Sequence, residues 1–197
     1  MRFGHLHSEH MRSELLLLVK EFAYARREVT LNSGAKSNFY IDCKKVSMRP
    51  DGAAALGALF FDGMRQIESD TGAQFDACGG MVIGSIPLSM ALTLHAFSHH
   101  RMLPSLCVRK EAKDHGTREL VEGASLTHGS KLLLTEDVVT TGRATIQAAQ
   151  ALREAGYEVG NVIAIVDRQA GGEQNLNNAG LKLHTLFNLA DFGEAVS

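Results

Sequence analysis

The strongest constraint on the fold comes from a continuous apolar strand at residues 131–135 and a second, mostly apolar strand at 159–166, with a helical segment at 142–155 between them. Strands that are apolar along their whole length are typical of parallel sheets whose two faces are covered by helices. Two more β-rich segments, at 76–83 and 103–108, alternate with helical segments at 53–69 and 87–98. The sequence therefore predicts an α/β fold with a doubly wound, mostly parallel sheet, in which ligands bind at the carboxyl ends of the strands.

The first 50 residues follow a different pattern. A helix is predicted at 8–25, and short strands are predicted at 28–31 and 39–43 around a polar turn at 32–37. We expect an N-terminal helix and hood segment at residues 1–50 (the hood) and an α/β core at 51–170. A C-terminal strand and helix at 171–197 are expected to complete the core and the hood.

The charge balance excludes some classes of partner. The 20 basic and 22 acidic residues give a formal net charge of −2, so we expect no nucleic-acid or membrane partner, and any anion site must be built locally.

No apolar segment is long enough to span a bilayer, and the N-terminus lacks the apolar region of a signal peptide. The three cysteines form no CxxC pair, which fits a reducing compartment, and we expect a cytoplasmic protein.

The sharpest local motif lies at residues 132–145, which read LLLTEDVVTTGRAT. An apolar strand leads into Glu136 and Asp137, and a turn rich in hydroxyls and glycine then leads into a helix. Backbone N–H groups at a helix N-terminus suit a phosphate, and carboxylates accept hydrogen bonds from a sugar diol. The alternative is an acidic strand end followed by a Thr-Gly turn that caps an ordinary helix.

A second motif is the charged segment at 108–117, which has neither helical nor strand periodicity. It carries four potential cations beside a glycine, namely Arg109, Lys110, Lys113 and His115. A cationic loop of this kind would neutralise negative charge that develops on a leaving group and exclude water when closed. The alternative is a solvated loop, which is what most charged runs are.

These two motifs resemble those of a known family. The segment at 132–145 resembles the phosphoribosyl pyrophosphate (PRPP) motif of type I phosphoribosyltransferases, and RKEAKDHGT followed by LVEG resembles the catalytic loop of orotate phosphoribosyltransferases. The resemblance implies that Lys113 is the principal catalytic cation, assisted by Arg109 and His115, and that the acid pair binds the ribose hydroxyls. It implies PRPP contacts from Lys36, Arg109, Lys110, Lys113, His115, Glu136, Asp137, Val138, Val139, Thr140, Thr141, Gly142, Arg143, Ala144 and Thr145, of which the last six form the 5′-phosphate loop.

Two further segments carry the same resemblance. SGAKSNFYID at 33–42 and VDRQ at 166–169 match the family, which implies orotate contacts from Phe39, Tyr40, Thr141 and Arg168. A planar guanidinium suits the adjacent carboxylate and carbonyl oxygens of orotate, although aromatic pairs on a strand are more often core residues. Some family members carry an aromatic–Lys pair where Ile83 and Gly84 stand here. Backbone N–H groups near Gly84 are then expected to bind pyrophosphate.

The function implied by the resemblance is orotate phosphoribosyltransferase, a pentosyltransferase of pyrimidine biosynthesis. It converts orotate and PRPP into orotidine 5′-monophosphate and pyrophosphate. The resemblance further implies Mg²⁺ carried by PRPP, with no metal site made by the protein alone, and a homodimer in which the catalytic loop reaches the neighbouring subunit. Two alternatives stay open: a type I transferase for a purine base, and a non-catalytic regulator that senses PRPP or a nucleotide. Arg168 argues against a purine, because purines lack the carboxylate that an arginine would bind.

Overall fold

The computed structural model describes residues 6–26, 29–30, 36–37, 39–111 and 120–193. The N-terminal part contains short elements, in the order α1 (Leu6–Leu18), a π-helix (Val19–Ala23), β1 (Tyr24–Ala25), β2 (Val29–Thr30), β3 (Lys36–Ser37), β4 (Tyr40–Ile41) and α2 (Lys44–Ser47). The rest contains α3 (Pro50–Thr71), β5 (Ala77–Met81), α4 (Ser85–Ser98), β6 (Ser105–Val108), β7 (Val121–Gly123), β8 (Lys131–Val139), α5 (Arg143–Glu154), β9 (Glu158–Asp167), α6 (Gly172–Asn178), β10 (Lys182–Asn188) and a 3₁₀ turn (Leu189–Phe192).

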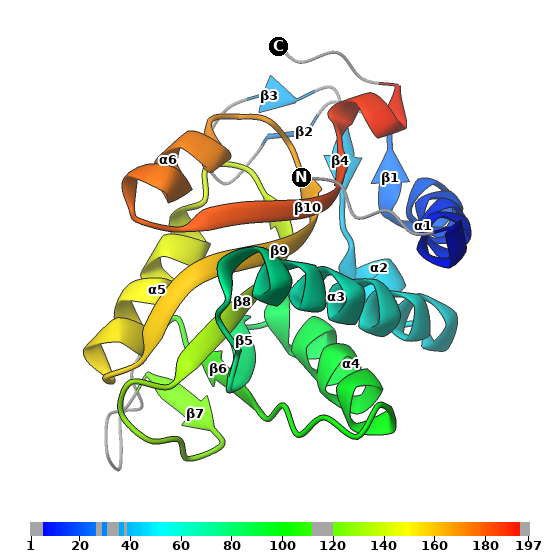
Figure 1. The fold of residues 1–197 in the computed structure, drawn as a ribbon. Coiled ribbons are helices and arrows are strands. Elements are labelled where there is room, and N and C mark those ends of the chain that lie inside the picture. Colours follow the sequence, from blue (N-terminus) through cyan, green and yellow to red (C-terminus); the bar gives the residue numbers. More distant parts are fainter. Residues whose placement is uncertain (1–5, 27–28, 31–35, 38, 112–119, 194–197) are drawn as a thin grey trace.

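A six-stranded sheet forms the centre of the molecule, with the strand order β10-β9-β8-β5-β6-β7 (Figure 1). All neighbouring strands are parallel except the edge strand β7, which pairs antiparallel with β6. Helices α3 and α4 pack on one face of the sheet, and α5 and α6 pack on the other. The predicted doubly wound, mostly parallel α/β fold is confirmed.

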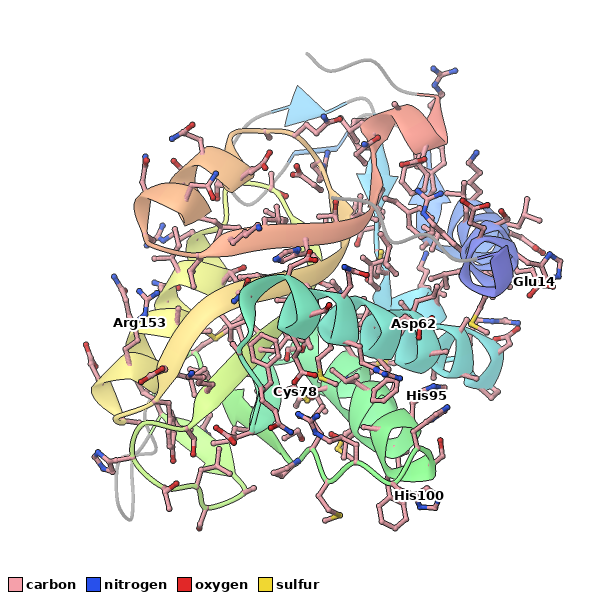
Figure 2. The ribbon with its side chains drawn as sticks, viewed as in Figure 1. Glu14, Asp62, Cys78, His95, His100 and Arg153 are labelled. Atoms are coloured by element: carbon pink, nitrogen blue, oxygen red, sulfur yellow. The ribbon has the colours of Figure 1, made fainter. Side chains whose placement is uncertain are left out.

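The apolar run of β8 explains why both faces are covered. Successive side chains of a strand point to opposite faces. Leu133 accordingly joins the core that lies under α3 and α4, while Leu132 and Leu134 join the core under α5, and all three are fully buried. Cys78 of β5 lies in the same core as Leu133, between the sheet and α4 (Figure 2). Two separate cores therefore hold the sheet rigidly, and its carboxyl edge is a stable platform for a site.

The hood packs against this core through α1 and against the C-terminal strand through one arginine. The Arg12 guanidinium donates hydrogen bonds to the Leu186 carbonyl oxygen at 3.0 and 2.8 Å and pairs with Asp191 at 3.2 Å. It also lies 4.7 Å from the centre of the Phe187 ring. Strand β1 pairs with β4, and Tyr24 stacks on Phe192 with 5.6 Å between ring centres. The beginning and the end of the described chain are thus joined beside the sheet (Figure 1).

Several predicted boundaries are wrong in the hood. The predicted helix at 8–25 ends as an α-helix at Leu18, and Tyr24–Ala25 form a strand because their backbone pairs with β4. The predicted turn at 32–37 contains β3, which pairs with β2. A short helix, α2, and the edge strand β7 were not predicted. In each case, hydrogen bonds to a segment distant in sequence decide the structure, and local propensity does not carry that information.

The most consequential boundary is that of β8. The predicted strand ends at residue 135, but β8 continues through Val139, because Val138 and Val139 pair with Val166 and Asp167 of β9. Glu136 and Asp137 therefore lie within a strand, where neighbouring side chains point to opposite faces.

Two smaller findings concern the expected compartment. Among the residues that the structure describes, no helix combines the length and apolar character needed to cross a membrane. Cys43, Cys78 and Cys107 are free thiols.

Candidate active site

The connections of the sheet diverge between β5 and β8, and this divergence places the site. From β5 the chain passes through α4 to β6 on one side, whereas from β8 it passes through α5 to β9 on the other. In open α/β sheets, ligands bind in the crevice at the carboxyl ends of the strands where the connections part in this way. The end of β8 and the start of α4 and α5 all meet here (Figure 1). The segment at 132–145 therefore lies at the position where such a fold binds ligands.

Glu136 points toward α5. One of its carboxyl oxygens accepts a hydrogen bond from the Thr145 hydroxyl at 2.8 Å, and the other accepts from the Asp137 amide at 3.1 Å. The residue is only 8% exposed. Burial, followed by the adjacent negative charge of Asp137, raises the pKa of the Glu136 carboxyl from 4.5 to about 8. At neutral pH this carboxyl is therefore largely protonated, and it braces the first turn of α5.

Asp137 points to the other side of the strand, toward the hood and α4. Its Oδ1 accepts a hydrogen bond from the Val138 amide at 2.8 Å, and its Oδ2 lies 3.4 Å from the Lys44 ammonium. The start of α4 approaches closely, since a Cβ on Gly84 would lie 2.9 Å from the Asp137 carboxyl carbon. Glycine at this position leaves room beside the carboxylate. Asp137 is thus the partly exposed acid, beside the hood and the start of α4, while Glu136 is buried.

The turn at 140–145 has the geometry of an anion site. Gly142 precedes α5 with φ of 74°, a left-handed conformation that favours glycine, and it brings no side chain to cap the helix. The first N–H groups of a helix have no intrahelical acceptor, so those of α5 are available to a ligand. Thr141, Arg143 and Ala144 are exposed, whereas Thr145 is buried against Glu136. The Thr141 carbonyl is fixed by a 3.0 Å hydrogen bond from Asn175 of α6.

The segment between β5 and α4 forms the other wall. The peptide bond between Val82 and Ile83 is cis, and the Ile83 side chain is exposed. Ser85 begins α4, and its hydroxyl lies 2.8 Å from the Thr135 hydroxyl in the buried interior. The α4 N-terminus at Gly84 is therefore anchored to β8, beside Asp137.

Phe39 and Arg168 come together although they are far apart in sequence. The Arg168 guanidinium lies 4.4 Å from the centre of the Phe39 ring and donates to the Phe39 carbonyl oxygen at 3.4 Å. Its backbone N–H donates to the carbonyl oxygen of Val139, the last residue of β8. Burial lowers the pKa of the Arg168 guanidinium. A buried cation with an aromatic face beside it thus stands at the same end of the sheet as the acid pair. Tyr40 follows Phe39 on β4, which pairs with β1.

Comparison with known proteins decides the family. No protein-family model matches the chain. A protein of Sorangium cellulosum named orotate phosphoribosyltransferase is 40% identical over 182 residues, which cover 92% of both chains. The protein of that name from Nostoc sp. (strain PCC 7120 / SAG 25.82 / UTEX 2576) is 39% identical over 181 residues, covering 92% of this chain and 84% of the relative. This chain belongs to the orotate phosphoribosyltransferase family.

Solved structures of the family agree with this assignment. The Mycobacterium tuberculosis H37Rv orotate phosphoribosyltransferase in complex with PRPP is 29% identical, with a TM-score of 0.74 over 93% of this chain and 99% of that one. The same protein in complex with Fe(III) dicitrate gives a TM-score of 0.76 at 31% identity over 93% of this chain and 99% of that one. Adenine phosphoribosyltransferase from Saccharomyces cerevisiae, at 15% identity, has a TM-score of 0.65, covers 88% of this chain and shares the fold.

The family's catalytic loop is described only at its two ends. Arg109 is half-buried, and its guanidinium pairs with Glu122 of β7 at 2.9 Å, while Lys110 is exposed. The predictions for Lys113 and His115 lie outside the described residues. Lys36 belongs to β3, and the prediction for its side chain also lies outside what is described. The structure therefore shows the base of the loop and leaves these three roles as predictions.

Sequence reasoning assigned no role to three residues that lie at the site, namely Asp42, Lys44 and Glu122. Lys44 and Asp42 contact each other at 2.7 Å, and Lys44 also contacts Asp137. Glu122 holds Arg109. The LVEG segment pointed to Glu122 only as part of a resemblance. No local signal distinguishes Lys44 from the neighbouring Lys45, because the partner Asp137 lies 93 positions away.

Proposed function

We propose that residues 136–145 hold the ribose 5-phosphate part of PRPP while the protein carries out the reaction of its family. In that reaction the 5-phosphoribosyl group of PRPP passes to orotate, and the products are orotidine 5′-monophosphate and pyrophosphate. The observation that carries the proposal is the meeting of an acid pair and a glycine-capped helix N-terminus at the divergence of β5 and β8.

The two halves of this segment would bind different parts of PRPP. The N–H groups and hydroxyls of residues 140–145 would receive the 5′-phosphate at the positive end of α5. Asp137, which opens toward the hood, would accept hydrogen bonds from the ribose hydroxyls. Glu136 would contribute mainly by holding Thr145 and the Asp137 amide in place. Val138 and Val139 would line the ribose through the backbone of β8.

Orotate would bind between the hood and the end of β9. The Arg168 guanidinium has the planar shape that matches adjacent carboxylate and carbonyl oxygens, and Phe39 offers an aromatic face next to it. We infer that Thr141 and Tyr40 complete this pocket. Orotate arrives as an anion, so the protein needs to orient it toward the anomeric carbon rather than remove a proton from it with a strong base.

Charge stabilisation is assigned to the catalytic loop. Breaking the bond between the anomeric carbon and pyrophosphate gives an oxocarbenium-like state and a leaving group that gains negative charge. Lys113, with Arg109 and His115, would stabilise that charge, and Lys36 and Lys110 would hold the pyrophosphate. The α4 N-terminus near Gly84 would add backbone N–H groups.

Mg²⁺ is proposed to arrive with PRPP. This ion prefers phosphate oxygens and water to a cage made entirely of protein ligands, and when bound it neutralises pyrophosphate charge. Of the two described acids at the end of β8, only Asp137 is partly exposed, and it already faces Lys44. That donor set suits a metal held chiefly by the substrate. Removal of Mg²⁺ with EDTA should abolish turnover, and added Mg²⁺ should restore it.

A homodimer is supported by the outer side of α4. Its exposed apolar side chains follow helical spacing at Ile86, Met90, Leu94 and Phe97, and the last two are 65% and 64% exposed. A continuous apolar stripe of this kind typically marks a protein interface. Such a dimer would let the catalytic loop of one subunit serve the site of the other.

The free thiols Cys43, Cys78 and Cys107 fit the reducing interior of a cell, and we propose a cytoplasmic enzyme.

Mixing two inactive variants tests the shared loop. Lys113→Ala removes the loop cation, and Asp137→Ala removes the ribose acid. If the loop acts across the interface, mixed dimers contain one intact site, and refolded equal mixtures should recover about a quarter of wild-type activity. Mixtures as inactive as the parents would place the loop in its own subunit's site.

The reaction itself is tested by the PRPP-dependent loss of orotate absorbance, with adenine and hypoxanthine as control bases. Turnover of orotate alone supports the proposed function. Turnover of a purine would favour the purine transferase, and PRPP binding without turnover of any base would favour a regulator.

A further inference from the structure

Lys44 forms the one described ion pair between the hood and the acid pair. Its ammonium lies 2.7 Å from Asp42 Oδ1 and 3.4 Å from Asp137 Oδ2. The two carboxylates come from different parts of the chain, one beside α2 and one within β8. Lys44 also donates its backbone N–H to Asp42 at 3.3 Å, so Asp42 holds both the main chain and the side chain of this lysine.

The unequal distances suggest a division of roles. The short contact to Asp42 anchors the ammonium, whereas the longer contact leaves Asp137 Oδ2 only loosely held. Asp137 Oδ1 is occupied by the Val138 amide. A ribose hydroxyl could therefore donate to Oδ2 without breaking the anchor between Lys44 and Asp42.

The local charges explain why a cation is needed. The side chain of Asp137 is 14% exposed and lies next to the buried Glu136, whose pKa is raised by burial and by the charge of Asp137. Burial alone would raise the pKa of the Asp42 carboxyl, but the hydrogen bonds and charge of Lys44, with a smaller contribution from the charge of Lys45, outweigh this and lower it. Burial opposes the charge of Lys44 in turn, and Asp42 and Asp137 together outweigh burial and raise the pKa of its ammonium. Lys44 and Asp42 thus support each other's charge, and Asp137 adds to the support of Lys44.

We propose that Lys44, anchored by Asp42, is a positioning residue that aims Asp137 at the ribose hydroxyls of PRPP. The proposal rests on the function proposed above for Asp137. It also couples the hood to the ribose site, because the cation that orients the acid belongs to residues 1–50, which carry the proposed orotate contacts Phe39 and Tyr40 as well.

The test compares Lys44→Met with Lys45→Met. Lys45 is the adjacent lysine and is exposed, so it is a matched control for loss of a charge and an ammonium. We expect Lys44→Met to raise KM for PRPP about tenfold, the effect of losing one partly buried charge contact, with kcat changed less than about threefold. Lys44→Arg should recover most of the affinity, and Lys45→Met should match the wild type.

A pH profile separates positioning from a structural role. The titratable groups that face Asp137 among the described residues are Glu136 on its own strand and Asp42, Cys43 and Lys44 from the hood. Lys44→Met removes the only cation of this set, and with it the hydrogen bond and charge that lower the pKa of Asp42. The acidic limb of kcat/KM for PRPP should therefore move to higher pH by about one unit in Lys44→Met. A packing defect would lower the whole profile without moving that limb.

The Asp137→Asn background distinguishes the failure of this proposal from failure of the ribose site. If Asp137→Asn leaves KM for PRPP unchanged, the ribose assignment itself is wrong. If Asp137→Asn raises KM but Lys44→Met behaves like Lys45→Met, the ribose site stands and the role of Lys44 is overturned. If Lys44 acts through Asp137, adding Lys44→Met to Asp137→Asn should change KM less than about twofold.

Circular dichroism first establishes that each variant is folded. Should Lys44→Met fail to fold, Asp42→Asn replaces it, because this variant keeps the lysine and removes only its anchor. It is expected to raise KM for PRPP and to shift the acidic limb in the same direction, by a smaller amount. A wild-type KM and profile in Asp42→Asn would overturn the proposal.

Discussion

Replacement of Glu136 with glutamine should make the protein more stable at pH 8 and change its stability little at pH 5. Glu136 is 8% exposed and sits beside Asp137, and its pKa is raised from 4.5 to about 8 in the folded state. A carboxyl with a raised folded pKa favours folding while it is protonated. That contribution is complete below pH 4.5 and is lost progressively as the pH rises to about 8. Glutamine carries no charge at any of these pH values, so it keeps the contribution.

The structure sets the size of the effect. The interval from 4.5 to about 8 corresponds to about 5 kcal/mol, at about 1.4 kcal/mol per pH unit. Part of this pKa difference arises from the interaction between Glu136 and Asp137, which titrate together. We therefore expect the free energy of unfolding of the wild type to fall by about 2–3 kcal/mol relative to the variant between pH 5 and pH 8. Glutamine can preserve the local hydrogen bonds, because its oxygen accepts from the Asp137 amide and the Thr145 hydroxyl can rotate to accept from its amide group.

Urea unfolding between pH 5 and pH 8.5 measures this difference. The chain contains no tryptophan, so circular dichroism is the appropriate signal. Glu154→Gln, at an exposed position of α5, is the control and should track the wild type throughout. Other groups titrate in this range, and subtracting the variant from the wild type at each pH removes their contribution. A difference that stays flat from pH 5 to pH 8.5 would refute the reasoning, because Glu136 would then ionise equally in the folded and unfolded chain.

Three other changes probe the site and the proposed interface. Arg168→Lys should raise KM for orotate about tenfold while leaving KM for PRPP unchanged in steady-state assays, since a lysine cannot bind two oxygens as a fork; equal changes in both constants would contradict this. Thr145→Val should cost about 1–3 kcal/mol of unfolding free energy at pH 7, because the buried Glu136 loses its donor, and Thr145→Ser should cost little. If the proposed homodimer forms through the outer side of α4, Leu94→Glu should convert it to monomers in sedimentation velocity, and an unchanged sedimentation coefficient would contradict this interface.

The sheet could be predicted from the sequence because its signal is local. Leu132, Leu133 and Leu134 are apolar whichever face they point to, and that uniformity predicts a strand covered on both sides. The order of strands and helices then follows from alternation along the chain. The hood could not be predicted in the same way. Tyr24–Ala25 and Lys36–Ser37 are strands of two residues each, and their pairing with segments elsewhere in the hood defines them.

In the candidate site too, the features that are contiguous in the sequence were predicted, and the contacts between distant residues were not. The acid pair and the turn at 140–145 were found because they are contiguous, and the family assignment followed from that segment together with the charged loop. The sequence did not show that Glu136 and Asp137 point to opposite faces, because the end of β8 depends on pairing with Val166 and Asp167. Their different environments give the two acids different chemistry: Glu136 is buried and largely protonated near neutral pH, whereas Asp137 faces a cation. Nothing in the sequence distinguishes the two carboxylates, whereas in the structure Glu136 braces the first turn of α5 and Asp137 is the acid proposed to bind the ribose. Lys44, the cation that Asp137 faces, lies 93 positions away from it in the sequence, so no local pattern could have shown this contact.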